Sequence, residues 1–250
     1  MANNLCDSKK IQIFHLLCEG NGIRSISRLT GASVNTISRL QTIWYERICV
    51  FNRHMVSSLF VSEIEADEIM TYVNSKHKTE GEFGVGICWV YVAIDRHSRM
   101  IIDFFIGRRT GAGAAEFLKK VSSRLSDECE ISTDMLKSYV SAITRTGNGY
   151  EWEEKNKILL VRSRNMGVNA LPRTITNRIE SHNGVIRQHV SRLTRRTRCI
   201  SKKRQKLVEH LTLFFFYYNF IKRQKTIKKT PAESYGIISK PMSIEQLISG

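Results

Sequence analysis

Three acidic residues, widely separated along the chain, could hold divalent metal ions: Asp67, Asp134 and Glu180. Mg²⁺ prefers oxygen ligands and is typically held by few protein carboxylates together with phosphate. Two such ions roughly 3.5–4 Å apart stabilise the attacking and leaving oxygens when a phosphodiester is cleaved or transferred. The three acids therefore predict a site for two Mg²⁺ or Mn²⁺ ions that acts on phosphodiesters.

Other acidic residues compete for these roles, so neighbouring positions must decide between them. Glu68 directly follows Asp67 in a predicted strand, and adjacent strand residues face opposite sides of a sheet. We assign the metal-binding role to Asp67 and not to Glu68. Glu65 shares the face of Asp67 and could support the metal ligands without binding metal itself, but we expect it at a solvated strand edge. Three further acids could also be placed near a site: Asp95, Asp103 and Asp127.

The helix that carries Glu180 adds a further candidate catalytic residue. Asn183 and Arg187 follow Glu180 by three and seven positions and share its helix face. The apolar residues of this helix lie on another face, which predicts packing on a sheet. We expect Asn183 to take part in the site, and we interpret His182 as a surface or packing residue rather than a catalytic one.

The elements that must position these residues alternate between strands and helices. Period-two patterns and helical apolar stripes predict strands at 62–73, 86–95, 100–107, 130–133 and 157–161, and helices at 113–125, after 133, at 175–195 and at 201–223. This order predicts an α/β sheet whose first three strands form a meander and whose later strands run parallel through helical crossovers. Asp67 falls in the first strand, and Asp134 falls at the carboxyl end of the fourth, where α/β sheets gather their sites.

Residues 9–42 are predicted to form three short helices. Gly31 and Ala32 make a tight turn, and Ser33 is a suitable N-cap for the third helix. Two helices joined by such a turn are typical of a helix-turn-helix, which would present Asn35, Thr36 and Arg39 to DNA. The alternative is a three-helix cap that makes no contact with DNA.

Charge favours a nucleic-acid partner. The net charge of the 250-residue chain is +16, and sixteen Lys or Arg against two Glu between Leu171 and Lys229 give that segment about +14. Although a charge run is usually a solvated face, this one flanks the proposed site, so we predict contacts with double-stranded DNA from Arg187, Arg192, Arg195, Arg196, Lys202 and Lys203.

The sequence gives little support to a membrane protein. The longest apolar run, Leu211 to Ile221, contains Thr212 and Asn219 and is too short to span a bilayer. The N-terminus lacks the apolar core of a signal peptide. No two of the six cysteines are closer than twelve positions, which excludes the usual zinc-ribbon spacing and favours free thiols. We therefore expect a cytoplasmic location, associated with the nucleoid in a prokaryote or nuclear in a eukaryotic host.

A series of short motifs follows the chain from the N-terminal helices to the C-terminal segment. In order they are Gly22-Ile23-Arg24-Ser25-Ile26, Arg28-Leu29-Thr30-Gly31, Asp67-Glu68-Ile69-Met70-Thr71-Tyr72-Val73, Trp89-Val90-Tyr91-Val92-Ala93-Ile94-Asp95, Gly107-Arg108-Arg109-Thr110, Ser132-Thr133-Asp134, Glu180 with Asn183 and Arg187, and Tyr218-Asn219-Phe220 with Thr230-Pro231-Ala232. In this order they resemble single-frame transposases of the IS1 family of insertion sequences. One departure is the run Lys222-Arg223-Gln224, near which relatives usually have a His.

The resemblance implies an RNase H-like core whose DDE triad corresponds to Asp67, Asp134 and Glu180. It implies a transposase that binds the ends of its element and catalyses strand cleavage and strand transfer, as a homodimer or larger assembly on DNA. We accordingly expect a helix-turn-helix region at 1–55, a catalytic domain at 60–200 and a basic, aromatic helical tail at 201–250. Two alternatives remain: a catalytically silent DNA-binding regulator derived from a transposase, and an RNase H-fold nuclease.

Overall fold

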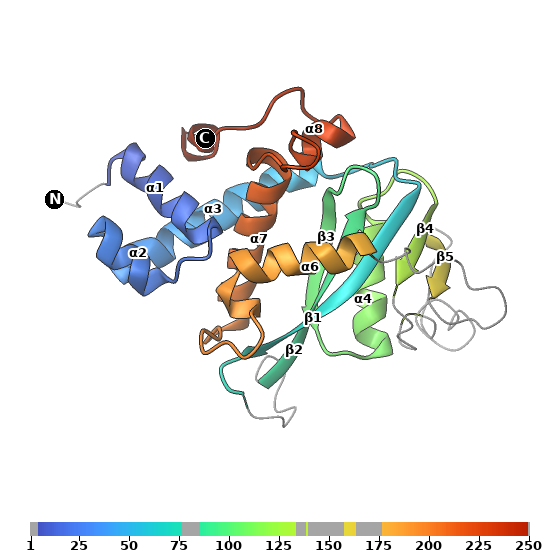
Figure 1. Cartoon of the computed structure of the whole chain (residues 1–250), viewed down its shortest axis with the longest axis horizontal. Coiled ribbons are helices and arrows are strands. Elements are labelled where there is room, and N and C mark those ends of the chain that lie inside the picture. Colours follow the sequence, from blue (N-terminus) through green and yellow to red (C-terminus); the bar gives the residue numbers. More distant parts are fainter. Residues whose placement is uncertain (1–4, 77–85, 134–138, 140–157, 164–176, 250) are drawn as a thin grey trace. The chain divides into compact units, whose positions relative to one another are not determined.

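The computed structural model describes residues 5–76, 86–133, 139, 158–163 and 177–249 (Figure 1). The chain forms two compact units: Val56–Gly184 is one, and Met1–Met55 together with Val185–Gly250 is the other. The first boundary lies close to the expected one at residue 55. The second differs from the sequence-based division, because the chain leaves the sheet-containing unit at Gly184 and residues 185–250 associate with the N-terminal helices.

The unit Val56–Gly184 is built on a five-stranded mixed sheet with the strand order β3-β2-β1-β4-β5. Its strands are β1 (Glu63–Val73), β2 (Gly86–Asp95), β3 (Ile101–Gly107), β4 (Cys129–Thr133) and β5 (Ile158–Ser163). β1, β2 and β3 form an antiparallel meander, while β4 runs parallel to β1 and β5 runs parallel to β4. The predicted α/β class, with its meander followed by parallel strands, is confirmed, and the arrangement is RNase H-like.

One face of this sheet is covered by α4 (Gly111–Ser122). Phe117 of α4 packs on Tyr91 of β2, with ring centroids 5.4 Å apart. Thr110 caps the helix by accepting a hydrogen bond from the backbone N–H of Gly113 at 3.2 Å. A Cβ at Gly113 would collide with the carbonyl oxygen of Arg108, so glycine is required where the strand turns directly into the helix.

The opposite face of β1 receives the first part of α6 (Asn177–His189), up to Gly184. Successive side chains of β1 point to opposite faces of the sheet, so this strand makes contacts on both faces. Glu65 and Asp67 point to one face and are hydrogen-bonded to α6, while Glu68 points to the face that carries Tyr91, its cross-strand neighbour. Figure 1 shows α6 crossing over β1. The predicted helix after residue 133 lies almost entirely outside the described residues.

The other unit is helical. It contains α1 (Asp7–Cys18), α2 (Ile23–Thr30), α3 (Val34–Met55), α7 (Arg204–Phe216), the π-helical turn η2 (Tyr217–Ile221), α8 (Pro231–Tyr235) and α9 (Ile244–Ser249). Its core is aromatic, since Phe14 packs edge-on against Trp44 and Phe51 packs against both Phe216 and Phe220. α3 continues to Met55, well beyond the expected end near residue 42, and no Gly or Pro interrupts it.

A buried polar cluster joins α7 to α3 and explains why the C-terminal residues are not a separate tail. The carboxylate of Glu209 is 2% exposed and accepts hydrogen bonds from Gln41 at 3.3 Å, Thr42 at 3.1 Å and Lys206 at 2.8 Å. Because a buried charge needs such partners, these contacts fix α7 on α3. They join residues nearly 170 positions apart in the chain, which local sequence patterns do not indicate.

The Thr230-Pro231-Ala232 motif is a helix start. Thr230 accepts a hydrogen bond from the N–H of Glu233, and Glu233 accepts one from the N–H of Thr230, which completes a capping box with proline at the first helical position. Within the described part of the chain, no helix combines the length and the apolar character needed to cross a bilayer.

Candidate functional site

The clearest feature of the sheet-containing unit is a hydrogen bond between β1 and α6. Oδ2 of Asp67 accepts it from Nδ2 of Asn183 at 2.7 Å, while Oδ1 accepts one from the N–H of Glu68 at 2.8 Å. Asn183 is 2% exposed, and its own Oδ1 is buried without a hydrogen-bond partner among the described residues. The structure thus brings together two of the predicted site residues.

Glu180 lies in the first turn of α6, three residues before Asn183, and its side chain is exposed. An acidic residue in the first turn interacts favourably with the positive end of the helix dipole. Because residues three apart lie on neighbouring positions of a helix surface, Asn183 fixes the side of α6 on which Glu180 is presented.

Asp134 lies outside the described residues. The residue before it, Thr133, pairs with Ala66, which directly precedes Asp67 on β1. The parallel register between β4 and β1 therefore places Thr133 and Ala66 side by side, and these are the residues that directly precede Asp134 and Asp67 in the sequence.

Glu65 is placed differently from the sequence expectation. It is fully buried, not at a solvated strand edge. Its Oε2 accepts a hydrogen bond from the N–H of Ile179 at 2.9 Å, and its Oε1 lies 3.6 Å from Nε of Arg96. Burial raises the pKa of Glu65, and the Ile179 N–H and Arg96 act in the opposite direction. The sequence does indicate that Glu65 lies on the same strand face as Asp67, because the two are two residues apart. Its burial under α6 depends on tertiary packing, which the sequence pattern does not show.

Glu68 faces away from α6, as the alternation of the strand predicts. Its Oε2 lies 3.3 Å from Nη2 of Arg109, whose guanidinium stacks over the Trp89 ring at 4.4 Å. Burial, with the nearby Glu68 charge, raises the pKa of both Tyr91 and Tyr139. These contacts belong to the side of the sheet that α4 covers, so Glu68 and Asp67 do not share a site.

Two of the competing aspartates have structural roles. Asp95 ends β2 and accepts hydrogen bonds from the N–H of His97, the N–H of Ser98 and the hydroxyl of Ser98, which forms the turn into β3. Asp103 lies 2.8 Å from both Lys120 and Arg124, an arrangement that ties β3 to α4 and the loop after it. The third, Asp127, accepts a hydrogen bond from the N–H of Glu128, the next residue.

His182 is a buried packing residue on α6, 5% exposed. Desolvation, together with the nearby Arg99 charge, lowers its pKa to about 3. The imidazole is therefore neutral at physiological pH, in line with the packing role that we expected.

The N-terminal helices show the local geometry on which the DNA-binding prediction depends. α2 ends at Gly31, whose φ of +70° is the left-handed conformation that glycine adopts readily. Ser33 then accepts a hydrogen bond from the N–H of Thr36 at 3.1 Å, as predicted for the N-cap of α3. Asn35 and Arg39 are exposed on the first turns of α3, and Thr36 is half-buried.

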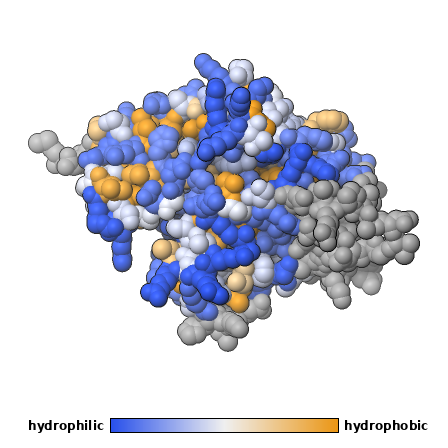
Figure 2. Space-filling model, viewed as in Figure 1, coloured by the Kyte–Doolittle hydropathy of each residue, from blue (hydrophilic) through white to orange (hydrophobic). Residues whose placement is uncertain are grey.

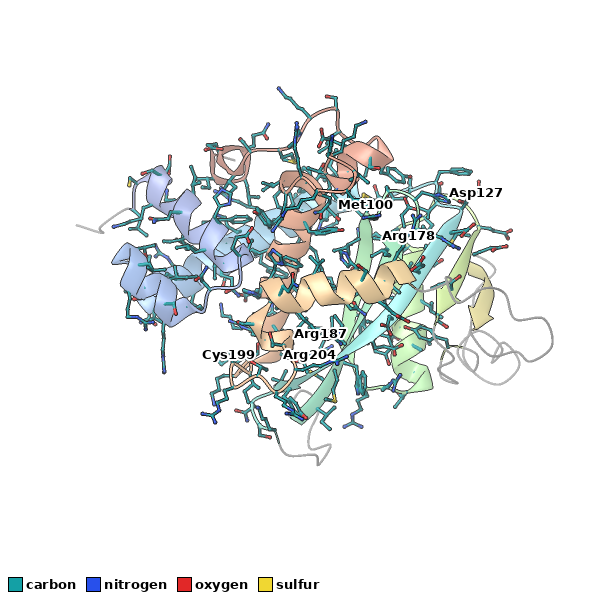
Figure 3. The ribbon with its side chains drawn as sticks, viewed as in Figure 1. Met100, Asp127, Arg178, Arg187, Cys199 and Arg204 are labelled. Atoms are coloured by element: carbon teal, nitrogen blue, oxygen red, sulfur yellow. The ribbon has the colours of Figure 1, made fainter. Side chains whose placement is uncertain are left out.

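The predicted basic residues fall into two groups. Arg195, Arg196, Lys202 and Lys203 are exposed. Hydrophilic side chains cover much of the face of the molecule that Figure 2 shows. Arg187, near the end of α6 in Figure 3, is half-buried. Arg192 is used internally, because it donates hydrogen bonds to the carbonyl of Lys206 at 2.8 Å and to Ser201 at 3.2 Å, and burial lowers its pKa.

The donors at this site suit a hard cation. Among the described residues, no three His, Cys, Asp or Glu side chains cluster as a metal site. What the structure does place together is the Asp67 carboxylate and a buried amide whose oxygen has no hydrogen-bond partner in that part of the chain. Oxygen donors of this kind fit Mg²⁺ or Mn²⁺ better than a metal that prefers sulfur.

Comparison with known proteins gives a family. A family model described as a DDE domain, of the IS240 transposase type, matches residues 66–206, which include all three predicted acids. The IS1 family itself is not confirmed. No curated protein matches the chain. One similar solved structure is the simian T-cell lymphotropic virus intasome in complex with PP2A regulatory subunit B56 gamma, with 12% identity and a TM-score of 0.47 over 94% of this chain and 75% of that chain. On the family match, which spans more than half of its length, the chain belongs to the DDE-domain transposases.

Proposed function

We propose that this protein is a transposase that binds the ends of its own element and catalyses metal-dependent cleavage and strand transfer of double-stranded DNA. The observation that carries the proposal is the hydrogen bond from Asn183 to Asp67. It attaches the helix of Glu180 to the strand of Asp67, two elements that are more than one hundred residues apart. Membership of the DDE family supplies the chemistry for which such an arrangement is suited.

In this proposal Asp67, Asp134 and Glu180 hold two Mg²⁺ or Mn²⁺ ions. When bound, the ions would stabilise negative charge on the attacking and leaving oxygens of the phosphodiester. Asn183 donates to one carboxylate oxygen of Asp67, and the Glu68 N–H occupies one lone pair of the other. Both donors belong to ordered elements, α6 and β1, so they hold the Asp67 carboxylate in a fixed orientation.

Catalysis needs no covalent protein intermediate, since the carboxylates act as ligands and not as nucleophiles. A water molecule attacks the phosphodiester at the element's end, and the freed 3′-OH then attacks target DNA in line. The neutral, buried His182 adds packing beneath α6 and no charge near this chemistry.

Recognition of DNA is assigned to the exposed start of α3 and to the basic segment after α6. Asn35, Thr36 and Arg39 would contact base edges as in a helix-turn-helix. Arg195, Arg196, Lys202, Lys203 and Arg187 would contact phosphates, whereas the internal hydrogen bonds of Arg192 favour a structural role. Joining both element ends in concert requires at least a dimer on DNA. The IS1 resemblance stays a prediction.

The test uses purified protein, DNA carrying the element's terminal repeats, and Mg²⁺. Wild type should give strand transfer, and Asp67→Asn, Asp134→Asn and Glu180→Gln should each abolish it while retaining DNA binding. Glu116→Gln, which changes an exposed glutamate of α4, is the matched control and should retain activity. End-specific binding without any strand transfer would identify a silent regulator, and cleavage without preference for the ends would identify a nuclease; either result overturns the proposal.

A further inference from the structure

We infer that Glu65 is a positioning residue that sets the register of α6 on β1 and thereby holds Asn183 at Asp67. Its importance for catalysis rests on the proposed function, whereas the placement of α6 can be measured independently of activity.

The first observation is a helix cap supplied by a distant strand. Ile179 is the third residue of α6, where a backbone N–H has no partner within the helix. Glu65 accepts this N–H at 2.9 Å from a fully buried position. A carboxylate at this end of a helix gains from a charge-assisted hydrogen bond and from the helix dipole. Glu65 therefore acts as the N-terminal cap of α6 although it lies 114 positions earlier in the chain.

The second observation is that the spacing of two contacts matches on both elements. Glu65 and Asp67 are two residues apart on β1, a rise of roughly 6.7 Å on one face of the strand. Their partners, Ile179 and Asn183, are four residues apart on α6, a rise of about 6.0 Å on one face of the helix. The two intervals agree to within about an ångström, and both hydrogen bonds are present, so α6 is held on β1 at two points.

The surroundings of Glu65 keep its carboxylate in place. Arg96 lies 3.6 Å from Oε1 of Glu65 and also pairs with Glu63 at 2.6 Å, while Arg178 of α6 donates a hydrogen bond to the carbonyl of Arg96. Figure 3 shows Arg178 at the beginning of α6. The strand, the turn after β2 and the helix start are thus connected through one buried carboxylate.

This geometry makes Glu65 more than a contributor to general stability. Glu180 is the next residue after Ile179, so the contact that caps the helix also fixes the helical turn bearing Glu180. A slip of α6 by one residue would rotate Asn183 by about 100° away from Asp67. A misplacement of only about 1 Å among positioning groups can reduce turnover by roughly 10²-fold.

The experiment compares a substitution that shortens the side chain but keeps its charge with one that keeps its length but removes the charge. Glu65→Gln keeps an oxygen at the same distance and should retain strand-transfer kcat within about threefold, because the amide oxygen still accepts the Ile179 N–H. Glu65→Asp keeps the charge but withdraws the acceptor by one methylene, and should lower kcat roughly 10²-fold with little change in KM for DNA. Glu65→Ala should lower kcat at least as far.

Glu68→Ala is the matched control, since Glu68 is a buried, ion-paired glutamate of the same strand that faces the other side of the sheet. Amide hydrogen exchange supplies a readout besides activity. Exchange in residues 177–184 should quicken in Glu65→Asp and Glu65→Ala, and should match wild type in Glu65→Gln and Glu68→Ala. If Glu65→Ala fails to fold, the Gln and Asp variants carry the comparison.

Full kcat in Glu65→Asp, or exchange in residues 177–184 that equals wild type, would overturn the positioning role. Failure of the proposed function has a different signature: wild type gives no strand transfer, or Asp67→Asn keeps it. In that case the exchange measurements still decide whether Glu65 places α6.

Discussion

Replacing Asn183 by Asp tests directly whether α6 meets β1 at Asp67. The two side chains have nearly the same shape, so packing is retained, but the donor 2.7 Å from Oδ2 of Asp67 becomes a second carboxylate. Two unit charges about 4 Å apart repel by about 4 kcal/mol at an effective dielectric constant near 20. Repulsion of this size raises the pKa of the carboxylate pair, because one proton shared between them removes it.

The raised pKa determines how stability depends on pH. The folded variant holds a proton that the unfolded chain releases near pH 4. The stabilising contribution of this proton is fully present below pH ~4 and is lost as the pH rises through the folded pKa. Compared with wild type at the same pH, Asn183→Asp should therefore be nearly as stable at pH 4 and about 2–4 kcal/mol less stable at pH 8.

The assay is urea unfolding of metal-free protein at several pH values from 4 to 8, with the double variant Asp67→Asn/Asn183→Asp as the control. The double variant exchanges donor and acceptor, so the hydrogen bond reforms in the opposite direction and most of the lost stability at pH 8 should return. If Asn183→Asp follows wild type in parallel across this pH range, the two side chains are not in contact and the placement of α6 is wrong.

Three further outcomes are expected. Glu209→Ala should lower the free energy of unfolding by about 1–3 kcal/mol, because it leaves the buried Gln41 amide and the partly exposed Lys206 without their acceptor. A loss below about 0.5 kcal/mol in denaturant titration would contradict this role. Burial lowers the pKa of His182 and His210 to about 3, so the stability that depends on their neutral forms is present above pH ~6.5 and is lost as the pH falls. At pH 4 each histidine should lower the free energy of unfolding by about 3 kcal/mol. His182→Gln should reduce this acid-induced loss in denaturant titrations, and His97→Gln, at an exposed position, should leave it unchanged. Replacing Arg195, Arg196, Lys202 and Lys203 by Gln should make the plot of log DNA-binding constant against log salt concentration less steep. The slope should fall by up to about 0.9 for each DNA phosphate that the variant no longer neutralises. Replacing the exposed Lys119 by Gln should leave the slope unchanged.

Much of the sheet could be predicted because its signals are local. The apolar run of residues 86–95 is a strand with those limits, and Ser33 caps its helix as a serine at that position should. Strand alternation also predicted that Asp67 and Glu68 face opposite sides, and their partners, Asn183 and Arg109, lie on opposite faces of the sheet.

The remainder depended on contacts between distant residues. Glu65 looks like an edge residue until α6 is placed over it, since the N–H that it accepts comes from Ile179. The association of residues 185–250 with the N-terminal helices likewise depends on contacts such as Gln41 with Glu209. The length of α3 is a different case, because the uninterrupted stretch from residue 42 to Met55 was visible in the sequence.

The matched spacing of the two β1–α6 contacts limits how this region can change in length. An insertion of one residue between Glu65 and Asp67 would turn one of them to the other face of the sheet. An insertion of one residue between Ile179 and Asn183 would rotate the amide by about 100° around the helix. The exposed side chain of Ser181, between the two α6 contacts, can vary, but the two intervals cannot. Natural variants of this protein should therefore place their insertions and deletions outside residues 65–67 and 179–183.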